Sequence, residues 1–167
     1  MSQQEKAAVQ ALKQALALEK DGHAFYLRAA ERTVDRKGQE MFQSLAEDEV
    51  VHVHVIQRQM DALSEGQGWS LPEDMGEVNV DLETPLFPQG KVNLERAVRP
   101  DASDLDALLF ALGIENDSFD MYRKQAQAAT NADARQLYEY LANAERTHFN
   151  LLMLNYESLN EGGSSGD

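Results

Sequence analysis

The chain has 167 residues, 43% of them hydrophobic, which is enough for one hydrophobic core. Its 29 acidic and 15 basic residues give a net charge of −14, which disfavours nucleic acid and anionic membranes as partners and favours the attraction of cations. The chain has no cysteine, which excludes disulfides and thiolate ligands, and no ~20-residue apolar run or signal-peptide core, which predicts a soluble cytoplasmic protein without membrane contact.

Four helices are expected in chain order. The first runs from about residue 4 to 34 and the second from about 37 to 64, with a tight turn near residues 35–38. A third helix begins near Ser103, taken as an N-cap with Asp106 three residues on, and a fourth begins near Thr130 with Asp133 in the matching place. Short turns make each pair antiparallel neighbours, so the fold class is all-α: a four-helix bundle of two antiparallel hairpins, 4–64 and 103–160.

The segment between the hairpins, residues 65–102, has a different character. It contains Trp69, all four prolines and the apolar run 84–88. Crossing a bundle of ~45 Å needs on the order of 14 extended residues, so more than half of the segment exceeds what a crossover requires. We expect a strap that packs Trp69, Leu86 and Phe87 on the bundle and forms a dimer contact, in preference to a moving lid. Residues 1–160 then form a single domain, and residues 161–167 a flexible tail.

One pattern occurs in both hairpins at a constant offset of 96 positions. Its first copy is Glu19, Tyr26, Glu49 and His52, and its second copy is Glu115, Tyr122, Glu145 and His148. Apolar residues repeat with it at steps of three and four, which marks one buried face of each helix. The pattern therefore predicts a duplicated helical hairpin whose four glutamates and two histidines point into the core.

Those six side chains predict a metal site. Unpaired carboxylates in the interior would be strongly destabilising, whereas two divalent ions balance the four glutamate charges. A Glu from each of two helices and a Glu-x-x-His pair from each of the other two is the ligand set of a two-metal site in a four-helix bundle. Mixed carboxylate and imidazole ligation suits iron or manganese. A metal-free helical scaffold is the remaining alternative, and it would leave six buried polar groups without partners.

With these motifs, the chain from about residue 4 to 160 resembles the rubrerythrin branch of the ferritin-like di-iron superfamily. The resemblance implies a centre of two iron ions that binds Fe(II) and reacts with O2 or hydrogen peroxide. It makes Glu19 and Glu115 terminal ligands, Glu49 and Glu145 bridges, and His52 and His148 one imidazole per metal. It also implies that Tyr26 and Tyr122 donate hydrogen bonds to a ligand carboxylate of the opposing helices, which would orient the ligands.

Three features depart from the rubrerythrin pattern. Rubrerythrin peroxidases carry an extra Glu where this chain has Ser118, with Gly22 at the corresponding place in the first half, and this weakens a peroxidase assignment. The chain lacks a rubredoxin segment, so no rubredoxin-type iron is expected and electrons must come from a separate donor protein. The crossover is also longer. The ligand set is similar to that of bacterioferritin too, but Val50 replaces its haem-binding Met, so no haem is expected.

Two classes of function follow. The first is a di-iron oxidoreductase, a ferroxidase or peroxidase-like enzyme of oxidative stress or iron handling, forming a homodimer or larger homo-oligomer. The alternative is a ferritin-like protein that binds and stores iron. His23 is expected in the core and not as a ligand, because Phe119 fills its repeat position, and His54 is expected at the surface. Glu47 and Asp48 are interpreted as a solvated face, in preference to the alternative that they guide incoming iron.

Overall fold

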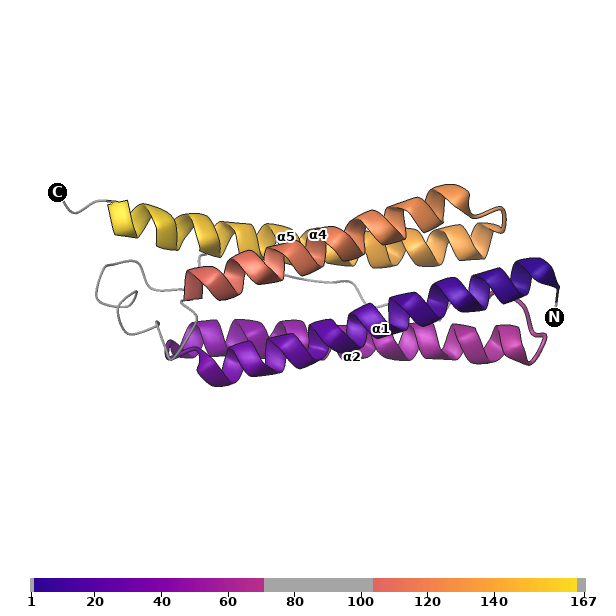
Figure 1. Cartoon of the computed structure of the whole chain (residues 1–167), viewed down its shortest axis with the longest axis horizontal. Coiled ribbons are helices and arrows are strands. Elements are labelled where there is room, and N and C mark those ends of the chain that lie inside the picture. The colour runs from indigo at the N-terminus through magenta and orange to yellow at the C-terminus, as the bar shows by residue number, and fades with distance from the viewer. Residues whose placement is uncertain (1, 71–103, 165–167) are drawn as a thin grey trace.

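The fold consists of four long helices. The structure, a computed structural model, describes residues 2–70 and 104–164, with side chains to residue 159. Its helices are α1 (Gln3–Arg32), α2 (Arg36–Ser64), α4 (Asp104–Ala128) and α5 (Ala132–Ser164), and the described residues contain no strand. The predicted all-α four-helix bundle is therefore confirmed (Figure 1).

Side-chain caps fix where three of the helices begin. Ser2 accepts from the backbone N–H of Glu5, and the Glu5 carboxylate accepts from the backbone N–H of Ser2, which together form a capping box for α1. Asp35 caps α2 by accepting from Gly38 N at 2.8 Å. For α5 the cap is Asn131, whose side-chain oxygen accepts from Ala134 N at 3.0 Å, so the expectation of a start at Thr130 is wrong by one residue.

Several sequence-based expectations need comment. Helix α5 continues through Ser164, so residues 161–164 are helical and do not belong to the flexible tail expected there. The expected N-cap Ser103 and the apolar pair Leu86 and Phe87 lie outside the described residues. Trp69 is described, and it packs against the core next to Tyr138 with ring centroids 5.9 Å apart.

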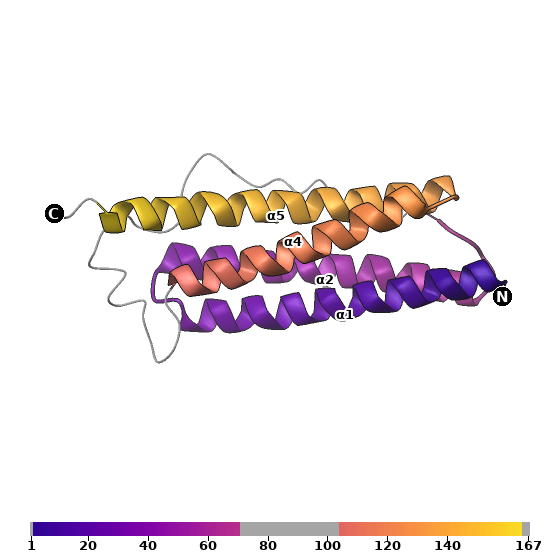
Figure 2. The same cartoon turned by 45° about the horizontal axis from the view of Figure 1, so that its top comes forward.

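The helices pair in the order of the chain. Helices α1 and α2 form one antiparallel hairpin, and α4 and α5 form the other, as both views show (Figures 1 and 2). The hairpins also touch through α1 and α4. The end of α2 and the start of α4 lie at opposite ends of the bundle, so α1 and α4 run in opposite directions.

Two apolar clusters fill the interior, and they are related by the 96-residue repeat. One cluster contains Tyr26, Phe42 and Leu45, and the other contains their counterparts Tyr122, Tyr138 and Leu141. Likewise, Leu108 of the first cluster corresponds to Leu12 of the second. The core therefore has an approximate twofold symmetry.

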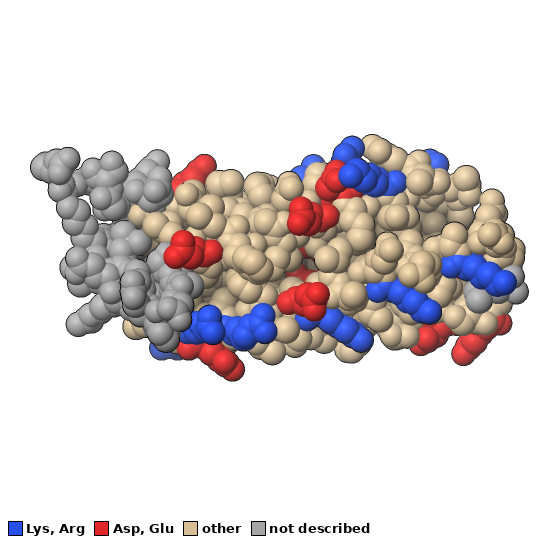
Figure 3. All heavy atoms as spheres, in the orientation of Figure 1, with Lys and Arg blue, Asp and Glu red and all other residues tan. Residues whose placement is uncertain are grey.

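The surface carries charges of both signs. On the face drawn in Figure 3, which α1 and α4 form, acidic side chains gather near the middle and basic ones follow the α1 side. Within the described part of the chain, no helix has the length and apolar character needed to cross a membrane.

Candidate metal centre

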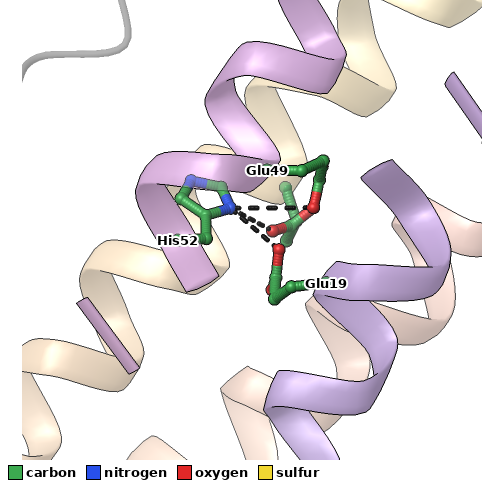
Figure 4. A group of neighbouring side chains, drawn as sticks. Glu19, Glu49 and His52 are labelled. Carbon is green, nitrogen blue, oxygen red and sulfur yellow. Dashed lines mark hydrogen bonds and ion pairs between the residues drawn. The ribbon is translucent and has the colours of Figure 1, made fainter. Parts of the chain in front are cut away.

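Each of the four helices contributes to a buried polar cluster at the centre of the bundle. Its members are at most 3% exposed: Glu19 on α1, Glu49 and His52 on α2, Glu115 on α4, and Glu145 and His148 on α5. All six residues expected as ligands are thus brought together. Figure 4 shows Glu19, Glu49 and His52 converging from the two helices of the first hairpin. The cluster is buried because its residues share their helix faces with the apolar core residues.

One side of the cluster is organised around His52. Its Nδ1 lies 3.0 Å from Glu19 Oε2, 3.2 Å from Glu145 Oε1 and 4.0 Å from Glu49 Oε2. A ring nitrogen has a single hydrogen-bonding position, which the contact with Glu19 uses. The Glu145 oxygen is consequently left without a hydrogen bond although it lies close.

The other side is organised around His148, and its contacts are longer. The Nδ1 of His148 lies 3.6 Å from Glu49 Oε1, 3.6 Å from Glu115 Oε1 and 3.8 Å from Glu145 Oε2. These distances are too long for hydrogen bonds. Among the described side chains, three buried polar atoms lack a hydrogen-bond partner, and all three belong to the cluster: Glu115 Oε2, Glu145 Oε1 and His148 Nδ1.

The spacing of these atoms suits a cation between them. Two ligand atoms that are each about 2.1 Å from one ion are about 3.0 to 4.2 Å apart, depending on the angle at the metal. Two sets of four residues have ligand atoms within 4.8 Å of one another: Glu19, Glu49, His52 and Glu145, and Glu49, Glu115, Glu145 and His148. Glu49 and Glu145 belong to both sets. The donors, oxygen and imidazole nitrogen, suit iron or manganese.

Two buried tyrosines hold the terminal carboxylates from the opposite hairpin. Tyr26 of α1 donates to Glu115 Oε1 of α4, and Tyr122 of α4 donates to Glu19 Oε1 of α1. Burial, together with the adjacent carboxylate of Glu115 or Glu19, raises the pKa of each phenol well above its usual value, so both remain protonated donors. Each tyrosine therefore links the two hairpins at the cluster and fixes one carboxylate oxygen.

Burial and neighbouring charges shift the pKa values of the carboxylates in the cluster. Burial, and then the charge of Glu19 or Glu115, raises the pKa of Glu49 and Glu145 well above the usual range. Burial would raise the pKa of Glu19 too, but the charge of His52 and hydrogen bonds outweigh it and lower that pKa to about 2. Ionising all four carboxylates together is therefore unfavourable, and a bound cation would relieve that repulsion.

Sequence reasoning missed one functional contact, that of Asp48. Asp48 Oδ2 lies 3.1 Å from Nε2 of His148, joining α2 to α5. A carboxylate on the outer nitrogen orients the ring and leaves Nδ1 to face the cluster. The contact appears on one side only, because the repeat position of Asp48 is Ala144. Since the repeat argument relies on equal residues in both halves, it contains no signal for this contact.

The remaining residues of interest fall as follows. Ser118 and Gly22 are both buried, and a Cβ at Gly22 would lie 3.3 Å from Glu49 Oε2 of the cluster. His23 is not part of the cluster, because its Nδ1 bonds the Ala46 carbonyl oxygen at 2.9 Å between α1 and α2. His54 is exposed, as the sequence predicted.

Comparison with known proteins adds one finding. A family model described as Rubrerythrin matches residues 10–156. No curated protein and no solved structure gives a significant match to the chain. The matched residues include all six members of the polar cluster and both tyrosines.

Proposed function

The chain belongs to the rubrerythrin family, and from this we propose that it is a non-haem di-iron protein that binds Fe(II) and reacts with O2 or hydrogen peroxide. The observation that carries the proposal is the group of three buried polar atoms without hydrogen bonds, all of which point into one cluster. Buried polar groups without partners are rare in folded proteins. Two ions ligated by the six side chains would give each of these atoms a partner.

In this proposal Glu49 and Glu145 would be the ligands that the two ions share. Glu19 and His52 complete the ligands of one ion, and Glu115 and His148 complete those of the other. Bound iron would supply electrons and Lewis-acid sites for the oxidant. The chain itself supplies a fixed geometry, because the ligands come from four packed helices and not from loops.

The residues around the ligands orient them through hydrogen bonds, and the ligands themselves should release protons when metal binds. Asp48 accepts from Nε2 of His148 and so keeps the Nδ1 lone pair directed at the metal. Tyr26 and Tyr122 remain protonated and restrain one oxygen each of Glu115 and Glu19. Because the bridging glutamates have raised pKa values before loading, metal binding should release protons from the site.

The electrons for turnover are proposed to come from a separate donor. The chain has no cysteine with which to hold a rubredoxin-type iron of its own. We also propose that the protein acts as a homodimer or larger homo-oligomer in the cytoplasm. Its charge of −14 supports attraction of Fe(II) and argues against nucleic acid as a partner.

Metal analysis and iron loading test the proposal. Protein purified without added metal is expected to contain iron, and aerobic loading should retain about two ions per chain. Retention far above two per chain would instead support the alternative, an iron-storage protein. Stopped-flow spectra after mixing the Fe(II)-loaded protein with O2 or peroxide would follow oxidation directly. A protein that binds no iron, or whose bound Fe(II) reacts with neither oxidant, would refute the proposal.

A further inference from the structure

A line of aromatic side chains leads from the cluster to the bundle surface. It begins at Tyr122, which donates to Glu19 Oε1. The ring of Tyr122 stacks on that of Tyr138 with centroids 6.4 Å apart, and Tyr138 meets Trp69 edge-on at 5.9 Å. Tyr122 and Tyr138 are buried, whereas Trp69 is partly exposed. These are contact distances for aromatic rings, so electrons can pass between neighbouring members without a gap.

The position of Trp69 is fixed by specific contacts. The buried amide of Gln59 donates to the Gly68 carbonyl oxygen at 3.1 Å and accepts from Ser70 N at 3.1 Å. These two bonds hold the backbone on both sides of Trp69. Gly66 and Gly68 have φ values of 76° and 80°, a conformation that glycine adopts without strain. The chain leaving α2 is thereby turned so that Trp69 rests against Tyr138.

The other half of the repeat has no such line. There Tyr26 stacks on Phe42, which occupies the repeat position of Tyr138, with centroids 6.1 Å apart. Its further neighbours are Phe25 and Phe110, which also lack an oxidisable phenol or indole. Phenylalanine is much harder to oxidise than tyrosine or tryptophan. The oxidisable line is therefore a feature of one side of the bundle only.

We propose that Tyr122, Tyr138 and Trp69 form a relay that delivers single electrons to the metal centre from a one-electron reductant outside the bundle. This rests on the proposed reaction with O2. Reduction of O2 to water takes four electrons, and two Fe(II) ions supply only two. Without further electrons the product is hydrogen peroxide. The relay supplies the missing electrons one at a time.

Each electron transfer balances along the line. Tyr122 gives an electron to the oxidised centre while its phenolic proton moves to Glu19. Tyr138 then reduces the Tyr122 radical, which takes its proton back from Glu19, while Tyr138 releases its own proton to water. Trp69 in turn reduces the Tyr138 radical, which recovers a proton from water, and the oxidised indole releases its N–H proton to water until it is reduced. The reductant finally restores Trp69. The net change is one electron moved from the reductant to the centre, and the proton consumed in forming water is supplied by solvent.

The outer end of the relay is accessible to a small reductant. Trp69 and Tyr138 border a surface hollow of about 450 Å³ between the start of α1 and the turn from α4 to α5. Much of its wall consists of alanine side chains, including Ala8, Ala11 and Ala134. A reductant here can reach the indole edge without approaching the buried cluster. Tyr138 also meets the hollow, where water can take and return its proton.

The contacts can be tested without iron, because Trp69 is the only tryptophan of the chain. The full chain is loaded with redox-inert Zn(II), and azide radicals generated by pulse radiolysis oxidise the indole. The indolyl absorption should then decay as tyrosyl absorption grows, at a rate independent of protein concentration. Tyr138→Phe should abolish this fast phase. Tyr156→Phe, a partly buried tyrosine of α5 packed in the other cluster, is the matched control and should retain it.

A fast phase that survives in Tyr138→Phe, or one that is absent in the wild type, would overturn the relay. The circular dichroism of each variant establishes that the helices are intact. If Tyr138→Phe fails to fold, Tyr122→Phe decides the question, since it should keep the first transfer but leave the radical on Tyr138. Electron paramagnetic resonance of freeze-quenched samples distinguishes these radicals by their ring orientations.

The role in turnover needs a second measurement with iron. Fe(II)-loaded protein is mixed with O2 in the presence of ascorbate, and the released hydrogen peroxide is quantified. The wild type and Tyr156→Phe should release little peroxide, whereas Trp69→Phe and Tyr138→Phe should release more of it for each O2 consumed. Equal yields would refute the relay even if the radical transfers with Zn(II). Lack of any O2 consumption would refute the reaction with O2 on which the relay rests, whereas the proposed function would be refuted only if peroxide also failed to react, and the Zn(II) experiment would still decide the contacts.

Discussion

The melting temperature should rise when metal binds. Replacing one ligand carboxylate by a neutral amide should change both this rise and the melting temperature of the metal-free protein. Each ion in excess at 100 times its dissociation constant stabilises the folded state by about 2.7 kcal/mol, if the unfolded chain does not bind it. For a chain of this size 1 kcal/mol corresponds to about 2 to 4 °C, so each ion should raise the melting temperature by roughly 5 to 11 °C. Two ions should give about twice that shift.

Glu145→Gln makes this prediction specific, because the two effects of the substitution have opposite signs. Burial and the neighbouring carboxylates raise the pKa of Glu145 in the folded state. A raised carboxyl pKa costs stability as pH rises above the unfolded value of about 4.3, and a neutral amide removes that cost. The metal-free variant should therefore melt higher than the metal-free wild type at neutral pH. It should also lose most of the metal-induced shift, since Glu145 is a member of both ligand sets.

Differential scanning calorimetry with anaerobic Fe(II), and separately with Mn(II), measures both effects. Glu139→Gln changes an exposed glutamate of the same helix and is the matched control, which should behave as the wild type does. An unchanged wild-type melt at saturating metal would contradict the metal centre. An equal shift in Glu145→Gln and in the wild type would show that metal binds elsewhere.

Four other substitutions test separate parts of the structure. Ser118→Glu places a carboxylate on the inward face three residues after Glu115, and stopped-flow mixing should show a preference shifted from O2 toward peroxide. Asp48→Asn weakens the restraint on His148, so metal affinity should fall by about 10- to 100-fold in a chelator titration. Burial and then Asp35 raise the pKa of Asp104 to about 6, so Asp104→Asn should raise the melting temperature above that pH but not at about pH 2, where Asp104 is protonated in both the folded and the unfolded chain. Asn131→Ala removes the cap of α5 and should cost about 1 kcal/mol in urea unfolding, with no change in metal affinity.

Helix positions were predictable because the apolar spacing is regular along each helix. The observed bounds of α1 and α2 differ from the expected 4–34 and 37–64 by at most two residues at either end. The end of α5 was not predictable in the same way. Two glycines at 162–163 favour termination, yet the helix continues through Ser164. The start of α5 depended on whether Thr130 or Asn131 meets the free N–H of the first turn, and this is a matter of local geometry.

The six members of the polar cluster were determined by the sequence itself. Glu49 and His52 lie on the same helical face as Phe42, Leu45 and Ile56, so burying the apolar residues necessarily buries the polar ones. The duplication then places a second, equivalent set opposite the first. Periodicity within each helix and repetition between helices carried all the information that this inference needed.

Only the tertiary structure decided which residues outside the cluster act on it. Asp48 lies on the flank of α2, and whether its carboxylate faces solvent or His148 depends on how the two hairpins dock. Trp69 follows the end of α2, and its contact with Tyr138 depends on a turn held by Gln59. Both contacts join residues of different hairpins and break the symmetry of the repeat. Helical periodicity describes one helix at a time, so it carries no information about contacts of this kind.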